Sequence, residues 1–215
     1  MNRREVGVVL ASVMVIVLVA TAGVALGAGL TPTSKKIVAG AIAPPTFFVN
    51  SALTGNGGGT AGRVQANDTL VIVFAGQALQ STLCSSWTNA SSAQSLAGFT
   101  FTLNDNTGTG STDTLTVTGT PVACASGFHF GTFDLKLGTY VSGGAATFTN
   151  SSIALSQTAT STTVTLTFGT AGGTGVLATA ASTSAAVYTP DATVTDTAAT
   201  AVGLNFATTT TTKQF

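Results

Sequence analysis

The side chains that could carry out chemistry are few and widely separated along this chain. There is one histidine, His129, and there are two cysteines, Cys84 and Cys124. A catalytic histidine needs a nucleophile and an orienting carboxylate within hydrogen-bonding reach. The sequence contains no Gly-x-Ser-x-Gly motif, and Phe128 and Phe130 flank His129 with the alternation of a strand. We therefore interpret His129 as an outward-facing histidine of a surface strand, and we predict that the protein is not an enzyme.

The carboxylates leave two interpretations open. Glutamate is absent after Glu5, and the six aspartates lie mostly in turn-like surroundings, where their side chains cap backbone amides. Glycosidase chemistry would need two carboxylates on either side of one bond. A calcium ion held by carboxylate oxygens is the alternative to turn capping, with Asp191 and Asp196 as its weak candidates. Apart from this alternative, we expect no metal and no cofactor.

Three aromatic side chains could bind sugar. Trp87, Tyr140 and Tyr188 would form a stacking platform if the fold brought them together on the surface. They are far apart in the sequence, and a core position for Trp87 beside the cysteines is the competing interpretation. A carbohydrate-binding module is therefore the alternative function, and a cluster of coplanar exposed aromatic rings would favour it.

The N-terminus predicts the compartment. Arg3 and Arg4 precede an apolar run over residues 6–26, which ends in small residues around Gly27. This pattern is typical of a secretory signal, so residues 1–27 are predicted to be a signal peptide. The run is also long enough to span a bilayer, so an uncleaved hydrophobic anchor helix is the alternative. Both alternatives export the rest of the chain, to the cell surface or the extracellular space.

An exported chain with two cysteines favours a disulfide between Cys84 and Cys124. Closing a loop of this length would stabilise the fold by roughly 4 kcal/mol in the chain-entropy model. Two buried free thiols are the alternative. A metal site would need further ligands that the sequence does not place nearby.

The charge content limits the partners. Charged residues are 7% of the chain, against about 25% in typical soluble domains, and the formal net charge is zero. Nucleic acid is not expected as a partner, because counterion release needs clustered lysines or arginines. A chain near neutrality has little protection against self-association. We expect self-association, or a cell-surface or polysaccharide partner, and contact with a membrane only through the N-terminal segment.

Strands are the elements that must position these residues. Residues 68–74 read Asp-Thr-Leu-Val-Ile-Val-Phe, the most apolar run after the N-terminal segment. These residue types pack well on a pleated surface. Their nearly unbroken hydrophobicity predicts a central strand that is covered on both faces. Residues 113–118 and 163–168 are similar in composition and are predicted to be its neighbours.

Short strands separated by Gly, Asn and Asp turns continue to the C-terminus, without a helical period after Gly29. They predict an all-β fold, an antiparallel β-sandwich of immunoglobulin-like or jelly-roll-like type, over residues 46–206. Residues 28–45 are predicted to be a linker or an initial strand. Residues 207–215 are predicted to be a flexible threonine-rich tail.

The strand at 68–74 resembles the Asp-Thr-Leu-x-Val-x-Phe strand of bacterial immunoglobulin-like domains in secreted and cell-surface proteins. Tyr-Thr-Pro-Asp at 188–191 and Thr-Asp-Thr-Ala at 195–198 resemble the segment that closes such domains. Those domains often have Gly-Asn after the alanine, where this chain has Ala199 and Thr200. The resemblance implies a β-sandwich that acts outside the cell.

A second resemblance concerns residues 34–40. They match the Ser-x-x-x-x-Ala-Gly start of camelysin-type fibre subunits, and this implies subunits that polymerise through an N-terminal strand. The sequence therefore leads to one main hypothesis. The protein is exported and non-enzymatic, with a structural or adhesive role, and a filament subunit is the extension of that hypothesis.

Overall fold

A computed structural model describes residues 47–89, 91–107, 111–124, 126–203, 206–207 and 213–215. All described residues belong to one compact unit, Ile42–Phe215. The predicted signal or anchor at 1–27 and the linker at 28–45 lie outside the described residues. In the part that the structure describes, no helix is long and apolar enough to cross a membrane.

Antiparallel strands dominate the described residues, which confirms the all-β prediction. The main sheet contains β1 (Phe48–Gly55), β2 (Thr69–Ala75), β3 (Ala93–Asn104), β4 (Thr114–Gly119), β5 (Thr132–Asp134), β7 (Ala146–Gln157), β8 (Ser161–Thr167), β9 (Thr170–Gly173), β11 (Val187–Thr189) and β12 (Phe206–Ala207). A two-stranded sheet pairs β6 (Val141–Ser142) with β10 (Val176–Leu177). The connections include one short helix, α1 (Gln80–Leu83), and a 3-10 turn, η1 (Val122–Cys124).

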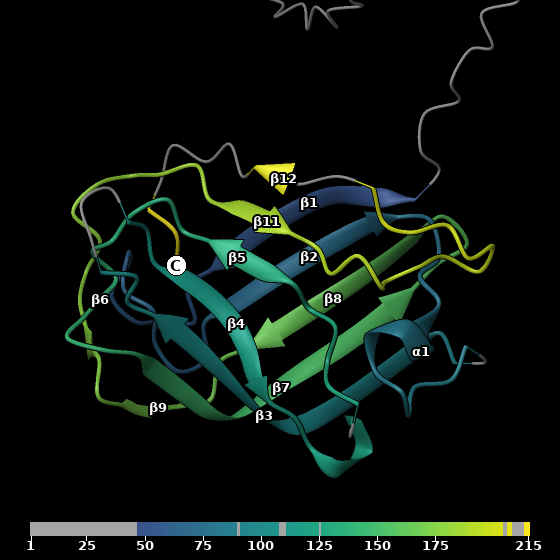
Figure 1. The fold of residues 1–215 in the computed structure, drawn as a ribbon, viewed down its shortest axis with the longest axis horizontal. Helices are drawn as coiled ribbons and strands as arrows, with labels where there is room; N and C mark the ends of the chain where they lie inside the picture. Colours follow the sequence, from purple (N-terminus) through teal and green to yellow (C-terminus); the bar gives the residue numbers. More distant parts are fainter. Residues whose placement is uncertain (1–46, 90, 108–110, 125, 204–205, 208–212) are drawn as a thin grey trace, which may run out of the picture. The chain divides into compact units, whose positions relative to one another are not determined.

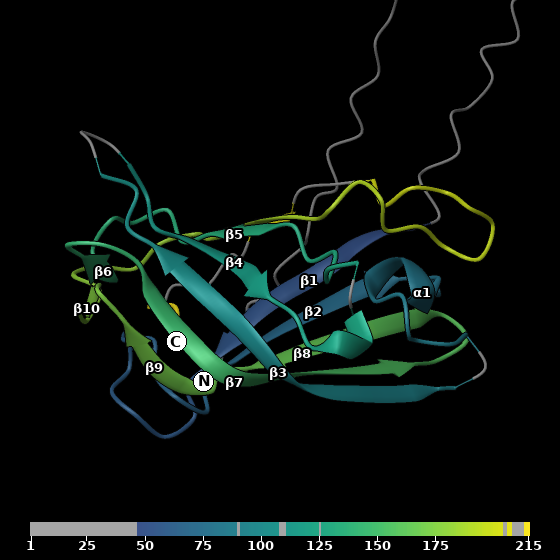
Figure 2. The same ribbon diagram turned by 60° about the horizontal axis from the view of Figure 1, so that its bottom comes forward.

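The main sheet curls into a nearly closed barrel (Figures 1 and 2). Its strands follow the order β1-β2-β8-β7-β3-β4-β5-β11-β12. β9 lies outside this order and pairs antiparallel with the start of β7. The first and last strands of this order, β1 and β12, lie in contact. The chain leaves β2 through α1 and reaches β3, three positions away in the sheet, and the β7–β8 hairpin supplies the two strands between them.

The strand at 68–74 is only partly as predicted. Its inward residues Leu70, Ile72 and Phe74 are fully buried, but Val71 and Val73 point outward and are half-buried. The prediction that both faces are covered is wrong for the described residues. Valine is favoured in strands whether or not its face is buried, so an unbroken apolar run could not separate the two cases.

The predicted neighbours of this strand have different outcomes. β8 pairs with β2 in an unbroken antiparallel register from Thr69 opposite Thr167 to Ala75 opposite Ser161. The other predicted neighbour forms β4, which instead pairs with β3 and β5. Similar composition indicates that both segments are strands, but it holds no information on which strands are adjacent.

Aromatic rings fill the barrel interior, and Phe168 has a central position among them. Its ring lies edge-on to those of Phe101, Phe148 and Phe215, with centroid separations of 5.3, 5.0 and 5.3 Å. All four side chains are buried. This cluster joins β3, β7 and the residue that follows β8 to the C-terminal residues.

The predicted flexible tail is wrong at its end. Residues 208–212 lie outside the described residues, but Gln214 and Phe215 are buried. The Thr54 hydroxyl donates a hydrogen bond to Gln214 Oε1 (3.1 Å), and the Phe215 amide donates to the Thr54 oxygen (3.2 Å). The Gly62 amide donates to the Phe215 carbonyl (2.7 Å). The threonine-rich sequence before Gln214 and Phe215 suggested a flexible tail, and composition alone could not reveal that these two side chains pack in the core.

Candidate functional site

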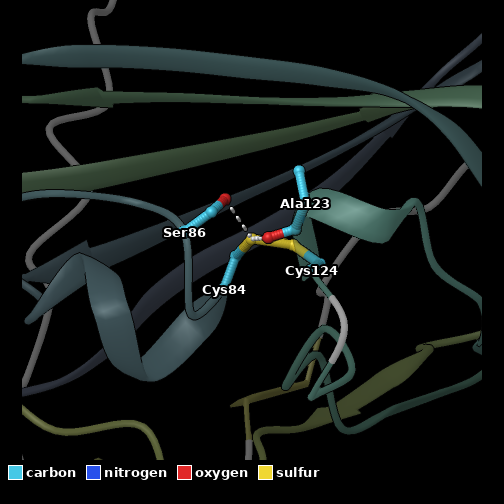
Figure 3. Close-up of a disulfide and its surroundings, with 4 residues drawn as sticks. All are labelled: Cys84, Ser86, Ala123 and Cys124. Atoms are coloured by element: carbon cyan, nitrogen blue, oxygen red, sulfur yellow. Dashed lines mark hydrogen bonds between the residues drawn. A yellow bond between two sulfur atoms is a disulfide. The ribbon is translucent and has the colours of Figure 1, made fainter.

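The two cysteines form a disulfide between two connections of the barrel (Figure 3). Cys84 follows α1, Cys124 ends η1, and their Cα atoms are 5.2 Å apart. Both cysteines are fully buried. The Ser86 hydroxyl lies 3.4 Å from the Cys84 sulfur. The structure thus agrees with the predicted pairing, and the site has a structural role, because the bond ties the β2–β3 connection to the β4–β5 connection.

Trp87 packs in the core next to this disulfide. Its amide donates a hydrogen bond to the Cys84 carbonyl (2.9 Å), and its ring lies edge-on to that of Phe128 at 5.6 Å. Tyr140 and Tyr188 are buried elsewhere in the core. The three candidate sugar-stacking residues are therefore all inside the domain and do not form a surface platform.

His129 has a carboxylate and a hydroxyl beside it, which the sequence prediction did not foresee. Its Nδ1 atom lies 3.2 Å from Asp191 Oδ2 and 3.0 Å from Thr193 Oγ1. About a third of the His129 side chain is exposed, and Phe128 and Phe130 point inward on either side of it. The expected outward direction of His129 is confirmed.

The hydrogen-bond arrangement of these three residues differs from that of a catalytic triad. The Thr193 hydroxyl donates a hydrogen bond to Asp191 Oδ1 (2.7 Å), so its proton is directed at the carboxylate. Both partners contact the same nitrogen of His129, whereas general-base catalysis places the carboxylate on one ring nitrogen and the nucleophile on the other. The cluster joins the loop before β5 to the loop after β11.

These contacts also set the ionisation of Asp191. Burial works to raise its pKa. Hydrogen bonds from the Thr193 amide and hydroxyl and from His129 outweigh burial and hold the pKa below its ordinary value. The carboxylate is therefore ionised and already has partners.

The two weak calcium candidates each serve their own loop. Asp191 Oδ1 accepts from the Thr193 amide (2.8 Å). Asp196 Oδ1 accepts from the amides of Ala198 (2.9 Å) and Thr200 (2.7 Å). In the described ranges, no three His, Cys, Asp or Glu side chains form a group that could hold a metal ion. Turn capping, the interpretation that the sequence favoured, accounts for both carboxylates.

Two buried carboxylates were not singled out from the sequence. Asp68 accepts hydrogen bonds from the amides of Gly57 (2.8 Å) and Gln65 (2.7 Å), and so fixes the glycine-rich loop against the start of β2. Asp113 Oδ2 accepts from the amides of Tyr140 (2.7 Å) and Val141 (3.1 Å). Among the described residues, Asp113 Oδ1 has no hydrogen-bond partner. Their positions before strands resembled turn residues, and only the fold buries them.

Burial raises the pKa of Asp113 from its ordinary value of 3.8, because desolvation outweighs the two amide hydrogen bonds. The folded state then binds a proton more readily than the unfolded state, so this group contributes less stability as the pH rises above 3.8. Asp68 shifts in the same direction for the same reason.

We expect the variant Asp113→Asn to lose less stability than the wild type between pH 4 and pH 7. Urea unfolding at both pH values measures this change. Asp134→Asn is the matched control, because the pKa of Asp134 shifts in the opposite direction. Burial of Asp134 is outweighed by hydrogen bonds and charge attraction from Lys136, which hold its pKa below the ordinary value. The stability that Asp134 contributes is therefore lost as the pH falls below 3.8 and is largely present at pH 4 and above, so Asp134→Asn should change the difference in stability between pH 4 and pH 7 only slightly. An unchanged pH dependence in Asp113→Asn would contradict the assignment.

Five neighbouring strands present a continuous outer surface that is available for contact, and we call it the outer face. Its residues form three rows in register across β1, β2, β8, β7 and β3. The rows are Ser51, Val73, Thr163, Ser156 and Ala93; Leu53, Val71, Thr165, Ala154 and Ser95; and Gly55, Thr69, Thr167, Ser152 and Ala97. None of these residues is buried, and none is charged.

A shallow hollow of about 420 Å³ lies within the outer face. Residues of β3, β7 and β8 line it, and they include the outward residues Ser95, Ala154 and Thr165 together with Gln94 and Leu155, which alternate with them. At the other side of the face, Leu53 on β1 is 49% exposed. The sequence predicted threonine-rich strands, but the placement of small side chains, a hollow and a protruding leucine on one face follows from the strand order.

Comparison with known proteins gives no relative: no protein-family model, no curated protein and no solved structure matches this chain. The class that fold and site define is therefore an antiparallel all-β domain with one disulfide.

Proposed function

We propose that this protein is an exported, non-enzymatic β-sandwich module of immunoglobulin-like or jelly-roll-like type, with a structural or adhesive role at the cell surface or outside the cell. The observation that carries the proposal is the outer face, where fifteen outward positions hold small, hydroxyl-bearing or aliphatic residues and no charge. Such a surface can bind another surface without desolvating ions, whose burial is costly. The secretory pattern of the N-terminal sequence and the disulfide support the extracellular location.

Strand exchange between subunits is the proposed route to filaments. β1 pairs with β2 along one edge, and its other edge lies beside β12, with which no ladder is recorded among the described residues. An extended segment of another copy could add its backbone along that edge of β1. The sequence before β1 offers Ile37 and Val38, which are strand-favouring residues.

The alternative, a carbohydrate-binding module, has less support. Stacking on sugar rings needs exposed aromatic side chains, whereas Trp87, Tyr140 and Tyr188 are buried in the core. The outer face offers hydroxyl groups without an aromatic ring in its three rows.

Electron microscopy of the purified, exported protein tests the filament extension. We expect filaments at high concentration, and we expect the double variant Ile37→Gly/Val38→Gly to abolish them while circular dichroism shows an unchanged β-sheet signal. Glycine at both positions raises the entropic cost of forming a strand. Thr33→Gly is the matched control outside that pair. Discrete monomers of the wild type at every concentration would contradict the filament proposal, and mass spectrometry of the mature N-terminus will distinguish a released protein from an anchored one.

A further inference from the structure

The outer face places a protruding side chain and a hollow in the same row. Leu53 is paired in register with Val71, then with Thr165 and Ala154, which lies in the hollow. Three strand spacings separate Leu53 from Ala154, a distance of about 14 Å. The two features are therefore at equal height along the strands, on opposite sides of the β2–β8 pair.

We propose that the outer face binds the outer face of a second copy of this chain about a two-fold axis. The axis lies in the plane between the two sheets, parallel to the strands and midway between β2 and β8. This rotation places Leu53 of each copy opposite the hollow of the other, which makes the contact self-complementary. Two sheets that pack in this way lie about 10 Å apart. The proposal rests on the proposed function, because it names the partner that this face binds.

The chemistry of the face fits burial against itself. No row contains a charged residue, so two copies meet without like-charge repulsion and without desolvation of ions. Val71 and Val73, which the barrel leaves half-exposed, would gain apolar burial, and each Å² of apolar surface removed from water contributes about 25 cal/mol. Hydroxyls of Thr163 and Ser156 can donate and accept across the interface.

The size of the face sets the expected strength. About this axis four strands of each copy, β1, β2, β8 and β7, oppose one another. With three rows they cover about 19 by 20 Å, or about 400 Å² per copy, from ordinary strand dimensions. Stable dimers bury about 800 Å² per partner. We therefore expect a weak dimer for isolated copies, reinforced where many copies are held close together on a surface or in an assembly.

Cysteine cross-linking of the full-length chain tests the geometry. We expect the single variants Leu53→Cys and Ala154→Cys, when mixed, to be joined by a bis-maleimide that spans about 10 Å, the separation of packed sheets. The linked dimer is seen on a denaturing gel and its 53–154 link is mapped by mass spectrometry. A link within one copy is excluded, because each copy carries only one of the two introduced thiols and the native cysteines are joined in a disulfide. The matched control is Leu53→Cys mixed with Val122→Cys, because Val122 is 93% exposed but lies in η1, outside the face.

A charge introduced beside the two-fold axis provides a second test. Adding Val71→Lys to both single-cysteine variants should reduce the linked dimer at least tenfold, while adding Val122→Lys should leave it unchanged. Linkage of 53 to 154 no greater than in the control pair, or linkage that survives Val71→Lys, would overturn the pairing. Electron microscopy of the same samples keeps the two proposals distinct: filaments without the 53–154 link leave the proposed function in place and reject only this interface.

Discussion

Replacing both cysteines with alanine should lower the free energy of unfolding by about 4 kcal/mol. The bond between Cys84 and Cys124 closes a loop with a sequence separation of 40. In the chain-entropy model, a loop of that size restricts the unfolded chain enough to stabilise the fold by about 4 kcal/mol. Both sulfurs are buried in the core, so loss of the bond also removes a link between the β2–β3 and β4–β5 connections.

The measurement is denaturant unfolding of Cys84→Ala/Cys124→Ala, followed by the fluorescence of Trp87, the single tryptophan, which packs beside the bond. Ser86→Ala is the control, because Ser86 touches the Cys84 sulfur but is exposed, and it should change stability by no more than about 0.5 kcal/mol. Reduction of the wild-type protein should add the mass of two hydrogens. A loss of less than about 1 kcal/mol in the double variant would show that the bond contributes little.

The variant Phe168→Ala should be destabilised by about 3–5 kcal/mol, the range for truncating a buried phenylalanine. Its ring contacts three others, from β3, β7 and the C-terminal residues. Truncation would leave a cavity that these rings cannot fill without breaking their own packing, since interiors are close-packed. The C-terminal residue Phe215 would lose its recorded ring partner.

Urea unfolding of Phe168→Ala and Phe168→Leu compares an emptied site with a partly filled one, and the leucine variant should lose clearly less stability. Phe48→Ala is a control for phenylalanine at a half-buried position on β1, and we expect a smaller loss there because less apolar surface leaves a buried environment. Equal losses in Phe168→Ala and Phe48→Ala would contradict a central role for Phe168.

Some features of the site could be predicted from the sequence, because they depend on neighbouring residues or allow only one arrangement. Only one pairing of two cysteines exists, so Cys84 and Cys124 could be matched without knowing the fold. The alternation of Phe128, His129 and Phe130 correctly predicted which of them point inward. The contact of His129 with Asp191 and Thr193 was not predictable, because 62 and 64 residues separate these partners.

The sequence by itself determined that the domain is built from strands. β-Branched and aromatic residues favour strands wherever they occur, and Gly, Asn and Asp favour the turns between them. The tertiary structure decided which strands are neighbours, that Asp68 and Asp113 are buried, that Gln214 and Phe215 pack in the core, and that Val71 faces outward beside Leu53. The physical reason is the range of the interactions. Strand preference acts within a few residues, whereas burial and strand order depend on contacts between segments that are distant in the chain.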